Sequence, residues 1–384
     1  MSSESTRREF LKDCLWSGCA LGALSVVMCE GIEAQDVSPG LVTGDASLNA
    51  VEARHWKKLD ESRVQCEICP RKCTVADLER GTCGVRENRG GTYFMLVHSR
   101  ACAMHTDPIE KKPLFHFMPG TNAFSIATAG CNIECKFCQN WQIAQFRPEQ
   151  VASVYLPPAE VARIARQQQA ASIAYTYSEP VVFYEYVFDC AAAGKKLGVR
   201  SVMVSNGFIN EKPLLELLPL LDAVKIDFKS FREQFYKETC RGELKPVLDT
   251  LVTLKKSGKW FELVVLIVPG LNDSDAELKD MTRWIMSNLG GDIPIHFTRF
   301  HPDYRLRNLP STPVGTLEKA REIARTEGIH FSYVGNVPGH PFESTYCPTC
   351  SKPLIRRVGY KILENVIASG RCPACKTAVP GVWG

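Results

Sequence analysis

The placement of cysteine constrains this chain more than any other feature. There are 17 cysteines in 384 residues, and most fall into three tight groups: Cys66/Cys69/Cys73/Cys83, Cys131/Cys135/Cys138 and Cys347/Cys350/Cys372/Cys375. Disulfide frameworks belong to small secreted domains that cannot build a core, and this chain is long enough to bury one. Spacings of two or three residues instead bring several thiolates onto one metal ion or iron–sulfur cluster. The pattern therefore predicts metal or cluster ligation.

Composition excludes several other classes of protein. Hydrophobic residues make up 45% and charged residues 23% of the chain, as in an ordinary soluble globular protein. The formal net charge is only +4, and no dense Lys/Arg tract with interleaved aromatic residues is present. We therefore expect no nucleic-acid partner.

The first 35 residues are excluded from the fold prediction. Residues 6–12, Thr-Arg-Arg-Glu-Phe-Leu-Lys, resemble a twin-arginine export signal, and an uncharged stretch follows over residues 14–29. Residues 32–34 form a small-residue cleavage site. This favours export to the periplasm or another extracytoplasmic space; the alternative is an amphipathic helix on a cytoplasmic enzyme. The stretch is too short and too weakly apolar for a stable membrane span.

The rest of the chain changes character at three places. Residues 36–60 are expected to be a linker, residues 61–119 a Cys-rich N-terminal module, residues 120–335 the core domain and residues 340–384 a four-Cys tail. In the core domain, short apolar runs predict strands at 123–129, 172–176, 201–205, 223–227, 261–268, 293–298 and 330–334. Amphipathic stretches between them predict helices at 158–170, 181–197, 211–218, 246–257 and 276–289.

The predicted strands are short, β-branched and nearly continuous in apolar character. Parallel strands that are covered on both faces have this composition, so the strand–helix repeat predicts an α/β fold with a parallel sheet or barrel. Polar and Gly-rich clusters follow several of the strands, where such folds place their active sites.

The central cysteines have the spacing Cys-x3-Cys-x2-Cys, directly after the first predicted strand of the core domain. A 4Fe–4S cluster has four iron sites, so three thiolates from Cys131, Cys135 and Cys138 leave one iron open. An open iron can chelate the amino and carboxylate groups of a methionine moiety and place a sulfonium beside a one-electron donor. A zinc ion with a distant fourth ligand is the competing interpretation.

This triad, with Phe137 before its last cysteine, resembles the signature of the radical S-adenosylmethionine (SAM) superfamily. The resemblance implies a partial (β/α)6-type TIM-like barrel that binds a 4Fe–4S cluster and SAM. It also implies a reaction: an external one-electron donor reduces the cluster, which cleaves SAM into methionine and a 5′-deoxyadenosyl radical that abstracts hydrogen from a substrate. The alternative from another class is a non-catalytic electron carrier or metal-binding scaffold.

Further residues extend the resemblance along the chain. Residues 175–180, which include Ser178 and Glu179, follow the second predicted strand, where superfamily members hold the methionine amino group. Glu179 is suited to a charge-assisted hydrogen bond with that group, although it could simply begin a helix. Asn206 follows the third strand and is similar to residues that contact the ribose, but Asn-Gly is also a common turn pair.

Two later elements resemble glycyl-radical activating enzymes. Asp227 and Lys229 form an Asp-x-Lys element at a strand end, where the resemblance implies contacts with SAM. Residues 268–273 are similar to the turn that flanks the adenine. His301 lies in a late Phe-His element and is implied to contact the cofactor, the alternative being a solvent-facing loop.

The motifs in combination resemble the AmmeMemoRadiSam-system radical enzymes, which are related to pyruvate-formate-lyase activating enzymes. They span residues 66–73, 81–86, 107–114, 138–141 and 333–337. The substrate would be a glycine of a partner protein or a small molecule. Members of this family are usually cytoplasmic, so the twin-arginine-like start is a departure from it.

The two outer cysteine groups predict further metal sites. Cys347/Cys350 and Cys372/Cys375 are paired Cys-Pro-x-Cys knuckles, the pattern of a zinc-ribbon-like closed site, with iron as the second choice of metal. The N-terminal group, Cys66, Cys69, Cys73 and Cys83, could bind zinc or an auxiliary cluster, or be structural thiols.

Overall fold

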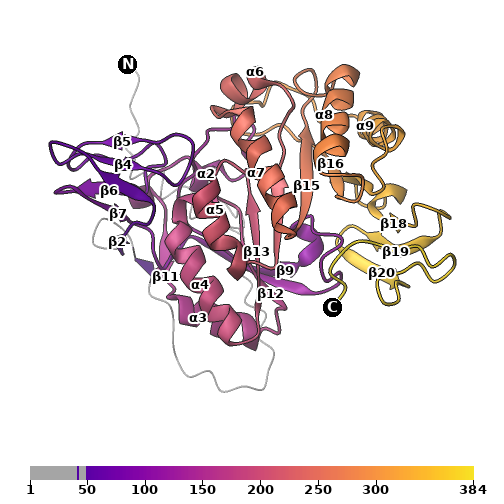
Figure 1. The fold of residues 1–384 in the computed structure, drawn as a ribbon, viewed down its shortest axis with the longest axis horizontal. Helices are drawn as coiled ribbons and strands as arrows, with labels where there is room; N and C mark the ends of the chain where they lie inside the picture. The colour runs from indigo at the N-terminus through magenta and orange to yellow at the C-terminus, as the bar shows by residue number, and fades with distance from the viewer. Residues whose placement is uncertain (1–40, 43–48) are drawn as a thin grey trace, which may run out of the picture. The chain divides into compact units, whose positions relative to one another are not determined.

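A computed structural model describes residues 41–42 and 49–384 of the chain. The export-signal prediction for residues 1–35 lies outside the described residues. Strands dominate up to about residue 108, an α/β domain follows, and a small three-stranded sheet ends the chain (Figure 1). Among the described helices, none is long and apolar enough to cross a membrane.

An eight-stranded mixed sheet forms the centre of the α/β domain, in the order β17-β16-β15-β14-β13-β12-β10-β9. Every neighbouring pair from β10 to β17 is parallel, and β9 adds an antiparallel edge that the sequence analysis did not predict. The bounds are β9 Ala103–Pro108, β10 Asn122–Ala127, β12 Ser172–Tyr175, β13 Arg200–Ser205, β14 Ala223–Asp227, β15 Trp260–Ile267, β16 Ile295–Arg299 and β17 Ser332–Gly335. Each of the predicted strands overlaps one of these parallel strands.

The parallel strands follow one another in space as they do in sequence. Right-handed crossovers in such a sheet place every connecting helix on the same face, and Figure 1 shows helices along one side of the sheet. The main helices are α3 Pro158–Gln167, α4 Tyr184–Lys196, α5 Glu211–Leu217, α7 Leu244–Ser257, α8 Asp275–Asn288 and α9 Val314–Thr326. The first five overlap the predicted helices, and α9 was not predicted.

Local chemistry sets several helix boundaries. Pro158 opens α3, where its missing N–H costs nothing. Ser274 caps α8 by accepting a hydrogen bond from the backbone N–H of Glu277. Gly258 ends α7 in the left-handed conformation, with φ of 69°. Shorter elements are α2 Trp141–Ala144, α6 Glu233–Phe235, a π-helix at Tyr236–Cys240, and 3₁₀ turns at Ile109–Lys111, Pro148–Gln150, Pro180–Phe183, Leu218–Leu220 and Pro341–Glu343.

The N-terminal module consists of small antiparallel sheets. One has the order β2-β7-β6 and another the order β3-β4-β5. Their strands are β2 Val51–Glu52, β3 Trp56–Lys58, β4 Val64–Cys66, β5 Thr74–Val75, β6 Arg86–Arg89 and β7 Thr92–Met95; β1 Leu41–Val42, β8 Arg100–Ala101 and β11 Ser153–Tyr155 form a third sheet. The prediction of a linker was therefore wrong over residues 51–58, because β2 and β3 pair with module strands.

A three-stranded antiparallel sheet at the C-terminus contains β18 Thr345–Tyr346, β19 Pro353–Val358 and β20 Lys361–Asn365. Polar contacts hold it to the α/β domain. The buried Arg357 side chain donates to Phe115 O at 2.9 Å and to Thr345 Oγ1 at 2.8 Å. The Tyr333 hydroxyl at β17 lies 2.9 Å from Thr345 Oγ1.

A buried ion pair joins the N-terminal module to the α/β domain. Arg86, the first residue of β6, is fully buried and forms two hydrogen bonds with the carboxylate of Glu185 in α4, at 3.1 and 2.6 Å. The backbone N–H of Arg54 donates to the same carboxylate at 2.6 Å. A bidentate pair with these additional donors is the geometry that compensates the desolvation of two charges.

We predict that Arg86→Met destabilises the protein by about 3–5 kcal/mol, because the Glu185 carboxylate is then buried without its cation. Urea unfolding measures the change. The double variant Arg86→Met/Glu185→Leu should recover much of the loss, since no isolated charge remains. Arg163→Met removes an exposed ion pair with Glu160 and serves as the matched control, with little change expected. Equal losses in the single and double variants would contradict the interpretation.

Candidate functional site

A cavity of about 310 Å³ opens at the carboxyl ends of the parallel strands. Its lining comes from the segments that follow β10, β12, β13 and β17 and from β14, β15 and β16 themselves. Nine of the predicted site residues line this cavity: Cys131, Cys135, Phe137, Cys138, Ser178, Glu179, Asn206, Asp227 and Lys229. Chain segments far apart in sequence meet here because parallel strands end at one edge of the sheet.

The loop that carries the central cysteines is held by backbone hydrogen bonds. Glu134 N donates to Cys240 O at 2.8 Å, and Lys136 N donates to Thr239 O at 2.9 Å. Gly130 opens the loop with φ of 102°. A Cβ atom at this position would lie 2.7 Å from Val85 Cγ1 and 3.0 Å from Cys83 O, so both conformation and space require glycine.

Cys240 is a neighbour of the triad that the sequence did not reveal. It lies outside the three cysteine groups of the sequence, yet its thiol forms a hydrogen bond with Cys135, which lowers the pKa of Cys135. Burial raises the pKa of Cys131 well above its usual value and that of Cys138 to about 12. Because thiolates are the ligands of metals, loading this site with a metal must release protons from Cys131 and Cys138.

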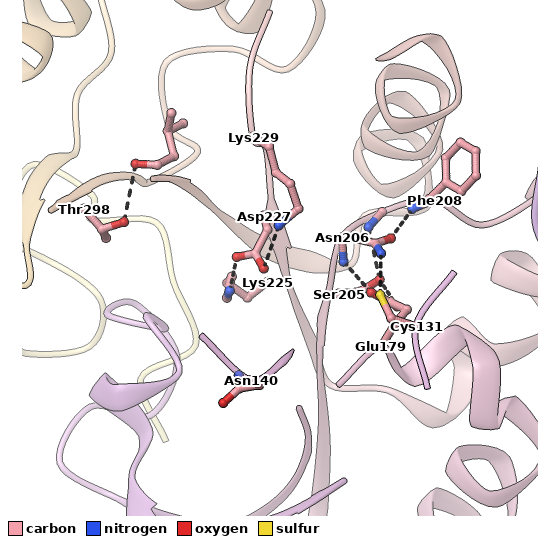
Figure 2. Close-up of polar contacts among 12 residues, drawn as sticks. Cys131, Asn140, Glu179, Ser205, Asn206, Phe208, Lys225, Asp227, Lys229 and Thr298 are labelled. Carbon is pink, nitrogen blue, oxygen red and sulfur yellow. Dashed lines mark hydrogen bonds and ion pairs between the residues drawn. The ribbon is translucent and has the colours of Figure 1, made fainter. Parts of the chain in front are cut away.

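Glu179 is the centre of the second polar group in the cavity. Its carboxylate accepts from Ser205 Oγ at 2.6 Å, from Asn206 N at 2.8 Å and from Val181 N at 3.2 Å (Figure 2). Burial raises the pKa of Glu179 to about 7, although these hydrogen bonds oppose the shift. The group therefore titrates near neutral pH and lacks a cationic partner among its hydrogen-bonded neighbours.

Asn206 is committed to local contacts. Its side-chain oxygen accepts from Phe208 N at 2.8 Å, and its Nδ2 donates to Asn132 Oδ1 at 2.8 Å and lies 3.8 Å from Cys131 Sγ (Figure 2). Both donor positions of the amide are thereby used, and one lone pair of its oxygen stays available. Asn206 thus links the segment after β13 to the cysteine loop.

Asp227 lies between two lysines at the end of β14 (Figure 2). Lys225 forms a hydrogen-bonded ion pair with Asp227 Oδ1, and Lys229 Nζ lies 3.6 Å from Asp227 Oδ2. Burial disfavours the charge of Asp227, but the two lysines outweigh it and lower the pKa of Asp227. Lys229 also lies 5.6 Å above the ring of Phe137. Lys225 also lines the cavity. The sequence analysis did not predict it as a site residue, because it lies within a predicted strand.

Two predicted site residues, Ser178 and His301, differ from each other in where they lie relative to the cavity. Ser178 is buried in the cavity lining, and its Oγ has no hydrogen-bond partner among the described residues, as expected of an atom aimed at a ligand. His301 is exposed, lies 3.2 Å from Ser311 Oγ and is outside the cavity lining. Its placement favours the solvent-facing alternative over a cofactor contact.

The cavity lining also includes a lysine pair, Lys111 and Lys112, that sequence reasoning missed. Lys112 is buried, and its Nζ lies 2.8 Å from Asp107 Oδ2, while Lys111 Nζ lies 2.9 Å from Asp107 Oδ1. Tyr177, with φ of 65°, donates its hydroxyl to the same carboxylate at 2.8 Å. Asp107, Lys111 and Lys112 lie within the 107–114 motif, to which the family resemblance assigned no role.

The C-terminal cysteines form a compact four-sulfur site. The sulfurs of Cys347, Cys350, Cys372 and Cys375 all lie within 4.8 Å of one another. The Cys347–Cys375 and Cys350–Cys372 sulfur pairs are separated by 3.5 and 3.7 Å. Tetrahedral zinc with bonds of about 2.3 Å places its sulfurs roughly 3.8 Å apart, so the geometry fits a single ion. Within residues 49–384, no other group of three or more potential metal ligands lies within 4.8 Å of one another.

Comparison with known proteins gives the class of this protein. The family model described as the radical SAM superfamily matches residues 125–285, which include the triad, Glu179, Asp227 and Lys229. An uncharacterized protein of Methanocaldococcus jannaschii is 43% identical over 326 residues, which cover 84% of this chain and 97% of that protein. The chain therefore belongs to the family of that archaeal protein, within the radical SAM superfamily.

Two weaker similarities are to proteins that have names. The (2S)-3-sulfopropanediol dehydratase activating enzyme of Klebsiella oxytoca is 20% identical over 127 residues, which cover 33% of this chain and 40% of that enzyme. A crystal structure of Streptococcus suis SuiB bound to S-adenosylmethionine has 13% identity and a TM-score of 0.45, covering 62% of this chain and 56% of that chain. Superfamily membership supports an enzyme of SAM-dependent radical chemistry and implies a 4Fe–4S cluster and SAM.

We predict that the purified protein contains about one zinc ion per chain at the C-terminal site. Replacing Cys372 and Cys375 with Ala should remove this zinc and open the 345–384 segment to hydrogen exchange, because the small tail depends on the ion for its fold. Elemental analysis measures the metal. Cys102→Ala is the matched control and should retain it. Iron in place of zinc, lost with the same two cysteines, would overturn the choice of metal.

Proposed function

We propose that the protein is a radical SAM enzyme whose 4Fe–4S cluster is held by Cys131, Cys135 and Cys138. The observation that carries the proposal is the convergence of this triad, Glu179 and the Asp227/Lys229 pair on one cavity from separate strand ends. When bound, the cluster supplies one electron from an external donor to the sulfonium of SAM, giving methionine and a 5′-deoxyadenosyl radical.

The residues around the cavity suit distinct parts of SAM. Glu179 provides a buried carboxylate for the methionine amino group, and the unpaired Ser178 hydroxyl can donate or accept beside it. Asp227 and Lys229 are proposed to contact SAM further along the cavity, with Asn206 contributing its remaining lone pair to the ribose. Phe137 packs below Lys229 and against Phe235, which restricts the position of the cysteine loop.

Zinc at the triad receives less support than a cluster. The three sulfurs do not form a group within 4.8 Å in the part of the chain that the structure describes, whereas the C-terminal sulfurs do. A four-iron cluster needs its thiolates further apart than a single ion does, because each thiolate binds a different iron. The same separation argues against the alternative of a simple metal-binding scaffold.

Finer assignments are proposals on the same basis. The motif combination supports the AmmeMemoRadiSam-system family, with a hydrogen abstracted from a partner protein's glycine or from a small molecule. We propose a sheet curved into a partial TIM-like barrel, with seven parallel strands instead of the six of a (β/α)6 unit. The predicted module, core and tail boundaries and the twin-arginine export route are likewise proposed, with a cytoplasmic location as the alternative.

The proposed reaction has a direct test. Anaerobic protein with a reconstituted cluster, dithionite and SAM should release methionine and 5′-deoxyadenosine, both measured by liquid chromatography. Cys135→Ala should abolish both products, because the cluster loses one of its ligands. Cys102→Ala, outside the triad, should retain them. Failure of the intact protein to form either product would leave the electron-carrier alternative in place.

We further predict that SAM binding tightens about tenfold between pH 6 and pH 8, since Glu179 must be ionised to pair with the amino group and its pKa is about 7 in the free protein. A raised pKa means that the carboxyl is protonated at pH 6 and must lose that proton on binding. Calorimetry on the clustered protein measures the affinity at each pH.

Glu179→Gln is the control for titration of SAM itself. The variant should bind SAM roughly 10- to 100-fold more weakly at pH 8, the loss of a charge-assisted hydrogen bond. Its affinity should not show the wild-type increase between pH 6 and pH 8. The same pH dependence in both proteins would exclude Glu179 as the responsible group.

A further inference from the structure

The N-terminal cysteines converge although their spacing in sequence is irregular. Cys66 ends β4, Cys69 and Cys73 lie in the β4–β5 connection, and Cys83 precedes β6. Cys66 N donates to Cys73 O at 2.9 Å. Cys73 Sγ lies 3.5 Å from Thr82 Oγ1, next to Cys83, and a Cβ atom at Gly81 would lie 3.6 Å from Cys73 Sγ. Cys66 and Cys69 are buried, whereas Cys73 and Cys83 are half-buried, so the two segments that carry the four thiols meet in one part of the module.

Backbone amides already point at these sulfurs. For three of the four thiols, hydrogen bonding by the backbone amide two residues later in the chain acts to lower the pKa, as in a metal-binding knuckle: Ile68 for Cys66, Arg71 for Cys69 and Val85 for Cys83. Such donors stabilise a thiolate more than a neutral thiol. The turns thus suit sulfur atoms that carry negative charge.

A buried cation accompanies the four thiols. Arg86 lies close enough to Cys66 and Cys83 for each to affect its charge. Its guanidinium is held in place by two hydrogen bonds with Glu185. Four thiolates on a metal centre carry excess negative charge, and a fixed arginine beside them reduces its cost.

The spacing of the sulfurs distinguishes a cluster from a single ion. Within residues 49–384, no three of these four sulfurs gather within 4.8 Å, unlike the C-terminal site of the same chain. A zinc tetrahedron needs sulfurs roughly 3.8 Å apart. In any three of these sulfurs, at least one pair is therefore more than 4.8 Å apart, which fits thiolates on separate irons better than thiolates on one zinc ion.

This module also touches the triad loop directly. Cys83 O would lie 3.0 Å from a Cβ at Gly130, the residue before Cys131, so the two backbones are in contact. Arg71, two residues after Cys69, donates its Nε to Asn132 O at 2.5 Å. The segments next to Cys69 and Cys83 are therefore both packed against the loop that carries the central cysteine group.

We propose that Cys66, Cys69, Cys73 and Cys83 bind a second, fully ligated iron–sulfur cluster, adjacent to the cluster at the triad. A reduced one-electron carrier would give this cluster one electron, which then passes to the triad cluster with no bond or proton change in the protein. The relay rests on the proposed function, whereas the metal site does not.

Iron and acid-labile sulfide content tests the site in the full-length, anaerobically purified protein. The intact protein should contain about four more iron atoms per chain than the Cys69→Ser/Cys73→Ser variant. The triple variant Cys131→Ala/Cys135→Ala/Cys138→Ala should still contain the iron of the N-terminal cluster, about four atoms per chain. Cys102→Ser is the matched control and should lose none. The triple variant separates the two proposals, since it lacks the SAM cluster and retains the N-terminal one.

Electron paramagnetic resonance tests adjacency. In the dithionite-reduced protein, the two paramagnetic clusters should broaden each other's signals, and the broadening should disappear in Cys69→Ser/Cys73→Ser. A triple variant with zinc or no metal at the N-terminal site overturns the proposal, as does full iron in Cys69→Ser/Cys73→Ser. If the triple variant contained as much iron as the intact protein, only the assignment of a cluster to Cys131, Cys135 and Cys138 would be refuted.

Discussion

The parallel hydrogen-bonded ladder from β10 to β17 is the constraint on which the rest of this protein depends. All strands of the ladder run in the same direction, so their carboxyl ends lie side by side. The segments after β10, β12, β13 and β17 therefore meet, although they are spread over roughly two hundred residues of sequence. The cysteine loop, the Glu179 carboxylate and the Asp227 pair belong to one cavity for this reason alone. The antiparallel β9 forms one edge of the sheet and carries Asp107, which pairs with two lysines of the cavity lining, Lys111 and Lys112.

Charge is distributed around that cavity in an uneven way. In the cavity, the half-buried Asp227 is paired with Lys225 and Lys229, and elsewhere in the fold the buried Arg86 is paired with Glu185. Glu179 has hydrogen-bond donors and no cation, and the Ser178 hydroxyl has no partner in the described residues. Buried groups that stay unsatisfied are costly, so a protein retains them where a ligand completes the set.

Much of the site could be predicted because its residues lie at strand ends, where hydrophobic periodicity stops and a polar cluster begins. Cys131, Glu179, Asn206 and Asp227 all fit this description, and each lines the cavity. Cys240, Lys225 and Lys112 could not be found in this way. Cys240 reaches Cys135 from a π-helical turn, Lys225 occupies a strand interior, and Lys112 belongs to a segment with no regular pattern. His301 is the opposite case, because it matches a family motif in sequence and yet its side chain is exposed.

The order of residues was sufficient to establish the strand–helix repeat, the three cysteine groups and the class of chemistry, because these depend on local periodicity and on ligand spacing. Tertiary structure decided what those patterns could not contain: that residues 51–58 pair as strands, that α9 and β9 complete the domain, and that Arg86 is buried against Glu185. It also decided that the chain segments carrying the N-terminal cysteines contact the loop of the central cysteines, through Cys83 O and the Arg71 side chain. Such contacts join residues far apart in the chain, so their energy depends on how separate elements pack and leaves no periodic trace in sequence.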